Sequence, residues 1–302
     1  MIEAKGLTKR YGDRLAVDGI SFTAKQGEIV GLLGPNGAGK TTTMRMLTGF
    51  MPPTTGSAKI AGHDIVDDSL EARRNVGYLP ERVPLYPDMT VRGYVTFWAK
   101  LRGVKASKPA VDAALARFHL TDRQNQLVRH LSKGLKQRLG LAQALVHNPP
   151  VIILDEPTIG IDPQQVIEVR DAVRALGQDH TVLFSTHILS EAEQVCDRVL
   201  IINHGKIVAQ GKPADLRRQL QPGSTLYVVT RGADKKKMRD LLASVPGVTH
   251  VESSGDGFTV KANTDVRGEL SAHISAAGGT LLEMRPVTTS LEDVFLELVK
   301  EG

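Results

Sequence analysis

Gly34-Pro35-Asn36-Gly37-Ala38-Gly39-Lys40-Thr41-Thr42 is the stretch that decides the fold of this 302-residue chain. It fits the spacing G-x-x-x-x-G-K-[ST]. The apolar run Ile29–Leu33 before it has the pattern of a buried strand, and Thr43–Leu47 after it continues as a helix. Glycines at these positions let successive amides point at phosphate oxygens, and the helix start adds partial positive charge there. The stretch therefore predicts a phosphate-binding loop (P-loop) between a strand and a helix.

The side chains of this loop predict how a nucleoside triphosphate and its metal ion bind. Lys40 is expected to reach the β- and γ-phosphates, and the Thr41 hydroxyl is expected to bind Mg²⁺. The predicted nucleotide contacts of the loop come from Asn36, Gly37, Ala38, Gly39, Lys40, Thr41 and Thr42.

Two adjacent carboxylates end a second predicted buried strand. The run Val151–Leu154 is apolar, and Asp155 and Glu156 follow it directly. Because a buried carboxylate costs desolvation free energy, stability alone does not explain this pattern. Asp155 is expected to hold Mg²⁺, directly or through water, and Glu156 to take a proton from the attacking water as general base. Acids that merely cap a following helix are the alternative, which the nearby P-loop disfavours.

Further motifs, in the same order along the chain, resemble those of the ATP-binding cassette (ABC) ATPases. Leu131-Ser132-Lys133-Gly134-Leu135 resembles the signature motif, and Gly160–Pro163, which contains Asp162, resembles the D-loop. His187, after a predicted strand, resembles the switch histidine, which implies a catalytic role beside Glu156. Tyr11 resembles the aromatic residue that stacks on adenine. The resemblance covers residues 1–212 and implies that the cofactors are ATP and Mg²⁺.

The signature motif predicts a second anion site. Ser132 is expected to cap a helix, so that its hydroxyl, the Gly134 amide and the helix dipole can bind a γ-phosphate. Because the P-loop of the chain holds its own nucleotide, the resemblance implies that Ser132, Lys133 and Gly134 bind the ATP of a second copy. Two copies would then sandwich two ATP molecules head to tail.

The chain departs from the usual family pattern in two places. Lys133 and Leu135 stand at the third and fifth positions of a signature that usually reads Leu-Ser-Gly-Gly-Gln. In Gly77-Tyr78-Leu79-Pro80-Glu81, Glu81 stands where the family has the glutamine of the Q-loop. A glutamate accepts hydrogen bonds from Mg²⁺-bound water but cannot donate them. Glu81 is therefore expected to contribute to the Mg²⁺ site with an added negative charge.

The predicted fold class is α/β: a P-loop NTPase cassette of the ABC type with a helical insert, followed by a C-terminal α+β ferredoxin-like domain. The expected boundaries are 1–212 for the cassette, with a helical subdomain at about 88–146, then a linker helix at 213–223 and the last domain at 224–302.

The C-terminal order β-α-β-β-α-β carries the ferredoxin-like prediction. Its predicted elements are Leu226–Thr230, Lys236–Val245, Val248–Glu252, Gly257–Lys261, Val266–Ala277 and Thr280–Arg285. A last helix is expected to follow, with an apolar stripe of Leu291, Val294, Phe295 and Leu298 and a capping box at Thr289 and Glu292.

The composition of the chain narrows the cellular compartment and the kinds of partner that we expect for it. A net charge of +5 is too weak to predict nucleic-acid binding, and a single cysteine excludes a disulfide framework. No stretch of about 18 apolar residues predicts a membrane span. Pro84–Val91 and Leu291–Phe295 resemble the bacterial exporter branch of the family, whose ATPase chain is separate from its membrane chain. The chain is therefore expected in the cytoplasm, held at the inner membrane by a permease subunit.

Two functions remain open on the sequence. The first is an ATP-hydrolysing subunit that powers a transporter, expected to be an exporter as in that branch, by ATP-driven dimer closure. The second is a single-cassette regulatory ATPase without transport. A GTPase is disfavoured because no Asn-Lys-x-Asp guanine motif occurs. A chromosome-maintenance ATPase would separate the two motifs by a long coiled coil, whereas Lys40 and Asp155 are only 115 positions apart. No pocket for a transported substrate is evident in the sequence.

Overall fold

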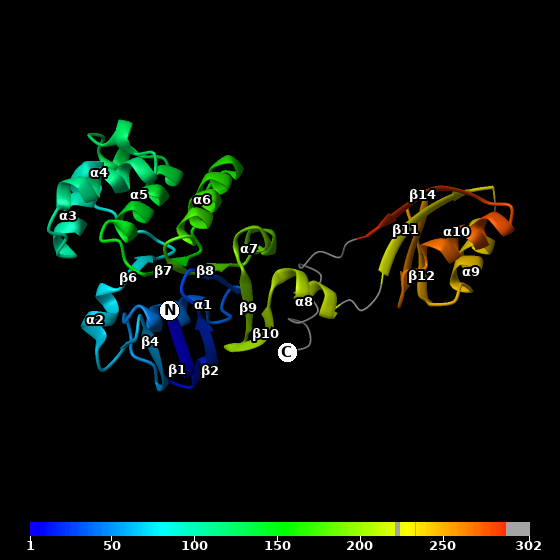
Figure 1. Ribbon diagram of the computed structural model, residues 1–302, viewed down its shortest axis with the longest axis horizontal. Coiled ribbons are helices and arrows are strands. Elements are labelled where there is room, and N and C mark those ends of the chain that lie inside the picture. Colours follow the sequence, from blue (N-terminus) through cyan, green and yellow to red (C-terminus); the bar gives the residue numbers. More distant parts are fainter. Residues whose placement is uncertain (221–223, 233, 288–302) are drawn as a thin grey trace. The chain divides into compact units, whose positions relative to one another are not determined.

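The computed structural model describes residues 1–220, 224–232 and 234–287, and its contacts divide the chain into two units, the first ending at Pro213 (Figure 1). The first unit is built on a six-stranded sheet. Its strands, in spatial order, are β10 (Lys206–Gly211), β9 (Arg198–Asn203), β3 (Ile29–Leu33), β8 (Thr181–Thr186), β7 (Val151–Asp155) and β6 (Val76–Leu79). All neighbours pair in parallel except β10, which forms an antiparallel hairpin with β9 at the edge. The central strands β3, β7 and β8 are buried throughout, which explains their unbroken apolar runs.

A second, antiparallel sheet was not anticipated from the sequence. It has the order β2 (Arg14–Ala24), β1 (Ile2–Tyr11), β4 (Thr55–Ile60) and β5 (His63–Asp64). Register shifts interrupt the pairing of β1 with β2, so their side chains do not alternate cleanly along the sequence. Helix α1 (Lys40–Leu47) lies against both sheets, and its buried Met44 and Met46 belong to one apolar cluster that includes residues of each. Packing between the two sheets fixes the start of α1, where the P-loop ends.

The insert between β6 and β7 is mostly helical, as predicted. It contains α3 (Val91–Leu101), α4 (Ser107–Arg117), α5 (Lys133–Leu145) and the short 3-10 helices Thr121–Arg123 and Val128–His130. Figure 1 shows α3, α4 and α5 grouped together beyond β6 and β7. The remaining helices of the first unit are α2 (Ser69–Arg74), α6 (Pro163–Leu176) and α7 (Leu189–Val195).

The second unit has the ferredoxin-like topology. After α8 (Pro213–Leu220), the order is β11 (Ser224–Arg231), α9 (Lys235–Ala243), β12 (Val248–Ser254), β13 (Gly257–Ala262), α10 (Arg267–Ala276) and β14 (Thr280–Pro286). The antiparallel sheet runs β12-β13-β11-β14, which places the first and third strands in the centre. A separate apolar core joins the sheet to α9 and α10, through residues such as Val228, Val260, Leu242 and Leu270.

Some predicted features lie outside the described residues. They are the last helix with Leu291, Val294, Phe295 and Leu298, its capping residues Thr289 and Glu292, and the linker residues Pro222 and Gly223. Within the described ranges, every helix is too short or too polar to cross a bilayer.

Candidate functional site

The P-loop joins β3 to α1 through a backbone that requires glycine. Gly37 and Gly39 have φ values of 84° and 110°, a region that side chains rarely allow. A Cβ atom on Gly39 would also approach the Ala16 carbonyl oxygen to 2.6 Å. The loop therefore lies tightly against the antiparallel sheet, and α1 begins at Lys40.

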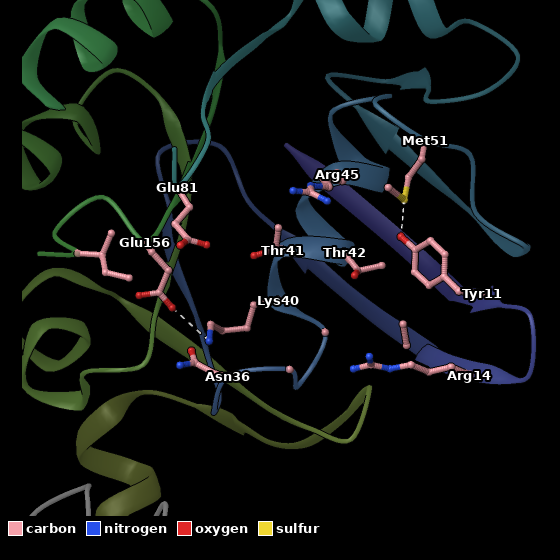
Figure 2. A pocket seen from close by; sticks show the side chains of 14 residues that line it. Tyr11, Arg14, Asn36, Lys40, Thr41, Thr42, Arg45, Met51, Glu81 and Glu156 are labelled. Atoms are coloured by element: carbon pink, nitrogen blue, oxygen red, sulfur yellow. Dashed lines mark hydrogen bonds and ion pairs between the residues drawn. The ribbon is translucent and has the colours of Figure 1, made fainter. Parts of the chain in front are cut away.

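A cavity of about 660 Å³ lies over this loop (Figure 2). Its lining contains most of the residues predicted to bind the nucleotide, together with residues that the sequence did not single out. They are Tyr11, Arg14, Ala16, Asn36, Gly37, Gly39, Lys40, Thr41, Thr42, Arg45, Met51, Glu81, Glu156 and Ile159. Ala38, which was also predicted, is buried instead of lining the cavity. The size and the cationic floor suit a nucleoside triphosphate.

Lys40 and Glu156 form a buried ion pair at the base of the cavity. The Lys40 Nζ lies 3.1 Å from Glu156 Oε1, and each side chain is only 6% exposed. The same ammonium donates to the Gly34 carbonyl oxygen at 2.7 Å. Figure 2 shows the pair with Glu81 nearby, on the side of the cavity opposite Tyr11. The predicted phosphate-binding cation and the predicted general base are thus in direct contact.

Asp155 has the surroundings of a metal ligand. Its Oδ1 accepts hydrogen bonds from Thr41 Oγ1 at 3.2 Å and from Ser185 Oγ at 2.7 Å. Its Oδ2 is buried without a hydrogen-bond partner. Burial raises the pKa of this carboxyl, and the negative charges of Glu156 and Glu81 raise it further, against the hydrogen bonds from Ser185 and Thr41. A cation at the free oxygen would offset this penalty.

The donor set fits Mg²⁺ in particular. Carboxylate and hydroxyl oxygens are the ligands that Mg²⁺ prefers, together with substrate phosphates and water. Across the described ranges, no group of three or more His, Cys, Asp or Glu residues could hold a metal ion by itself. A metal at Thr41 and Asp155 would therefore need phosphate oxygens or water to complete its coordination shell.

Glu156 also contacts His187. The His187 Nδ1 lies 2.8 Å from Glu156 Oε2. The backbone of Glu156 has φ +48°, a strained conformation of the kind that collects at functional sites. Its N–H donates to Ser185 Oγ at 2.9 Å, so Ser185 holds Asp155 and Glu156 at once. Ser185 was missed as a site residue; its signal was a polar residue at the end of a buried strand.

The predicted signature and D-loop motifs touch each other within the chain. Ser132 caps α5 by accepting from the Leu135 N–H at 3.3 Å, as predicted. The Lys133 ammonium lies against Gly160, and the Gln165 side chain lies against Gly134. Within the described part of the chain, none of these residues lines the cavity over the P-loop.

Asp162 caps α6, and its Oδ1 accepts from the Gln165 N–H at 3.0 Å. Asp162 is exposed and does not line the cavity. The structure therefore places the signature and D-loop residues together, apart from the P-loop residues.

Tyr11 lies at the end of β1 and is 45% exposed. Its hydroxyl donates to the Met51 sulfur at 2.9 Å, and the Lys9 ammonium lies 5.6 Å from the ring centroid. Figure 2 shows Tyr11, Met51 and Arg14 together on one wall of the cavity. Met51 and Arg14 were not identified from the sequence, because no motif marks them.

Two family profiles match the chain. Residues 17–159 match the sequence profile of the family described as ABC transporter. Residues 211–299 match the profile of the C-terminal domain of DrrA1-3-like ATP-binding proteins.

The chain is similar over nearly its whole length to curated proteins. It is 37% identical to an uncharacterized ABC transporter ATP-binding protein of Bacillus subtilis, over 99% of each chain. It is 38% identical to the Nod factor export ATP-binding protein I of Burkholderia orbicola, over 98% of this chain and 96% of the relative. A solved dimeric ATP-binding cassette in a post-hydrolysis state, bound to ADP and Pi, matches with a TM-score of 0.65 and 26% identity, over 70% of this chain and 98% of that one.

Proposed function

This chain belongs to the ABC transporter family of ATP-binding proteins, and we propose that it powers export by closing on a second copy of itself around ATP, against a separate membrane subunit. It is an ATPase whose hydrolysis is coupled to transport. The contacts of Glu156 with Lys40 and with His187, next to the hydrogen bond between Thr41 and Asp155, carry the proposal. The similarity to a Nod factor export protein supports export as the direction.

The hydrolysis step assigns a role to each group at the base of the cavity. Lys40 binds the β- and γ-phosphates, and Glu156 orients the attacking water and takes its proton. His187 holds the Glu156 carboxylate through the 2.8 Å contact. Thr41, Asp155 and Glu81 would hold Mg²⁺, which offsets negative charge on the phosphates.

The adenine end of the nucleotide lies on the wall formed by Tyr11. The half-exposed ring offers a flat surface for stacking, and the hydrogen bond to Met51 fixes its orientation. The P-loop residues Asn36, Gly37, Gly39 and Thr42, which line the cavity, bind the phosphates.

The signature residues serve the ATP of a second copy. Ser132, Lys133 and Gly134 lie at the start of α5, where the amides and the helix dipole favour an anion. Their distance from the P-loop lining supports a role in trans, with Asp162 of the D-loop at the same surface. The similarity to a dimeric cassette supports pairing with a second copy.

A groove beside the ATP cavity is the docking site that we assign to the membrane subunit. It encloses about 650 Å³, with Phe50 and Trp98 among its apolar walls and Arg82 and Arg102 among its charged ones. Phe50 is 71% exposed. The groove shares Thr41, Arg45 and Glu81 with the ATP cavity, so that a docked segment can sense the nucleotide. This contact would hold the chain at the cytoplasmic face of the inner membrane.

Dimer trapping tests the proposal. Glu156→Gln with ATP and Mg²⁺ should elute as a dimer in light scattering, and with ADP as a monomer. Adding Ser132→Arg should abolish the dimer without loss of ATP binding, since it blocks only the trans site. A Glu156→Gln variant that stays monomeric at saturating ATP would contradict the proposed ATP-bound dimer.

Copurification tests the transport role. Co-expression with a membrane protein whose reading frame adjoins that of this chain should give a complex whose ATPase rate differs from that of the free subunit. Phe50→Asp should break this complex and leave ATP binding intact. A chain that forms no such complex and has a constant ATPase rate would favour the regulatory alternative.

A further inference from the structure

A carboxylate outside the cavity, Glu191 of α7, is buried in an unusual way. It is 5% exposed, and none of the ion pairs that the described residues form includes it. A single oxygen, Oε2, accepts a hydrogen bond from Thr158 Oγ1 at 2.8 Å and another from Thr186 Oγ1 at 3.0 Å. Burying a carboxylate without a cation costs desolvation free energy. Two hydrogen bonds from hydroxyl groups offset only part of this cost, so stability alone does not explain Glu191.

The two threonines belong to the loops that carry the catalytic groups. Thr158 follows Glu156 by two residues, after β7, and Thr186 directly precedes His187, at the end of β8. Thr186 Oγ1 also accepts from the Ile188 N–H at 3.0 Å, which fixes the backbone on the far side of His187. One oxygen of Glu191 therefore ties both loops to a single point.

We propose that Glu191 is a positioning residue that sets the separation of Glu156 and His187. The 2.8 Å contact of Glu156 Oε2 with His187 Nδ1 spans the same two loops. Within the part of the chain that the structure describes, Glu191 does not line the ATP cavity, so it acts through the loops and not on the nucleotide. This inference rests on the roles proposed above for Glu156 and His187.

Thr158 also connects this point to the nucleotide and to the dimer surface. The next residue, Ile159, lines the ATP cavity, and Gly160 begins the D-loop that touches Lys133. Loss of the Glu191 anchor would therefore disturb the alignment of the general base more than the binding of the phosphates.

Two substitutions at Glu191 separate hydrogen bonding from charge. Glu191→Gln keeps an oxygen that can accept from both hydroxyls, whereas Glu191→Leu keeps the bulk and removes the acceptor. Glu191→Leu should lower kcat by roughly 10- to 100-fold, because small misplacements of catalytic groups have effects of that size. Its KM and its ATP affinity by calorimetry should stay unchanged, and Glu191→Gln should restore kcat to within about threefold of the native value.

Glu28→Leu is the matched control. Glu28 is also a partly buried carboxylate, but it pairs with Arg198 at the opposite ends of the strands, where Glu28 directly precedes β3 and Arg198 is the first residue of β9. Its substitution should lower the Tm and leave kcat unchanged. A purely structural role for Glu191 would give the same result for Glu191→Leu.

The pH profile gives a second readout. Because Glu191 is proposed to set the distance between Glu156 and His187, Glu191→Leu should shift the midpoint of the pH dependence of kcat. Glu28→Leu should leave this midpoint unchanged. Thr158→Val and Thr186→Val each remove one donor, should lower kcat in the same way and should not add to the effect of Glu191→Leu. They also serve as the test if Glu191→Leu fails to fold.

Three outcomes would overturn the proposal: native kcat in Glu191→Leu, equal losses in Glu191→Gln and Glu191→Leu, or full additivity with the threonine variants. Glu156→Gln measured in parallel separates this failure from a failure of the proposed function. An active Glu156→Gln would refute the general base itself, whereas an inactive Glu156→Gln beside a fully active Glu191→Leu would refute only the positioning role.

Discussion

The Lys40 ammonium contacts a carboxylate, Glu156, that the proposed mechanism needs as a base. Both side chains are almost fully buried, at 3.1 Å from each other. Removing one partner of a buried pair leaves the other charge uncompensated, so each substitution here has an electrostatic effect besides the loss of its own role. Substitutions at these two positions separate the binding of ATP from its hydrolysis.

Glu156→Gln should abolish turnover and preserve ATP binding. The amide keeps the shape and an oxygen that can accept from Lys40, but it cannot take a proton from water. General-base losses are typically about 10²–10⁴-fold. Phosphate release and calorimetry measure the two effects, and retention of more than about a tenth of native activity would contradict the assignment.

Lys40→Ala should lose ATP affinity itself, since it removes the side-chain cation predicted to bind the phosphates. Without nucleotide it should also lower the Tm, because Glu156 is left buried without its cation. Calorimetry and thermal unfolding check the two parts. Unchanged ATP affinity would refute the role of the lysine.

Asp155→Asn should abolish the Mg²⁺-dependent ATPase activity and raise the thermal stability at neutral pH. The pKa of Asp155 is raised by burial above 3.8, its ordinary value. A carboxyl with a raised pKa in the folded protein holds its proton more tightly there than in the unfolded chain. Its ionisation therefore destabilises the fold as pH rises through the window from 3.8 to the raised value, and the penalty is fully present above it.

The Tm of Asp155→Asn relative to the native protein, measured with EDTA, should accordingly be higher at pH 7 than at pH 4. Its Mg²⁺-dependent ATPase activity should be lost. An equal difference in Tm at both pH values would show that the ionisation of Asp155 carries no such penalty.

At the scale of elements, α5 and α6 meet where the signature and the D-loop lie. Gly134, in the first turn of α5, has the Gln165 side chain against it, and Gly160 has φ +66° with the Lys133 ammonium against it. There is no room for a Cβ at Gly134 unless Gln165 moves. Because a glutamine side chain is flexible, the fold can accept that movement, but the surface offered to a second copy changes.

Gly134→Ala should therefore keep its Tm and its ATP affinity and lose ATP-dependent dimerisation in the Glu156→Gln background. Gly268→Ala is the control, since Gly268 lies in the first turn of α10 with open space around it. That change should stabilise the chain by up to about 1 kcal/mol and leave dimerisation unchanged. A Gly134→Ala variant that dimerises normally would exclude the start of α5 from the interface.

At the scale of the whole molecule, each of the two units has an apolar core of its own among the residues that the structure describes. The cluster around Met44 and Met46 contains only residues of the first unit, and the cluster around Val228 and Val260 only residues of the second. All the residues proposed for catalysis and metal binding lie in the first unit: Lys40, Thr41, Glu81, Asp155, Glu156 and His187. We therefore expect the ATPase unit to fold without the C-terminal unit.

A chain truncated after residue 222 should stay soluble and bind ATP with native affinity. It keeps every residue that lines the ATP cavity. Calorimetry and thermal unfolding of the truncated chain check this expectation. Aggregation or loss of ATP binding would show that the first unit needs the second to fold.

The sequence alone determined the features whose chemistry is local. The P-loop, the Asp155-Glu156 pair, the N-cap at Ser132 and the β-α-β-β-α-β order could be predicted, because each is a short pattern with its own steric or electrostatic cause. The fold class and the family followed from these patterns.

Tertiary structure alone decided what those residues touch. The antiparallel sheet was missed because its strands pair with register shifts, and Met51 and Arg14 join the ATP cavity only through that sheet. Ser185 lies beside Asp155 because β7 and β8 pair in parallel with these two residues in register. Glu191 reaches Thr158 because α7 packs back beside the same strand ends. Such contacts join residues about 30 positions apart or more, and their partners are set by strand register and packing, which no local pattern encodes.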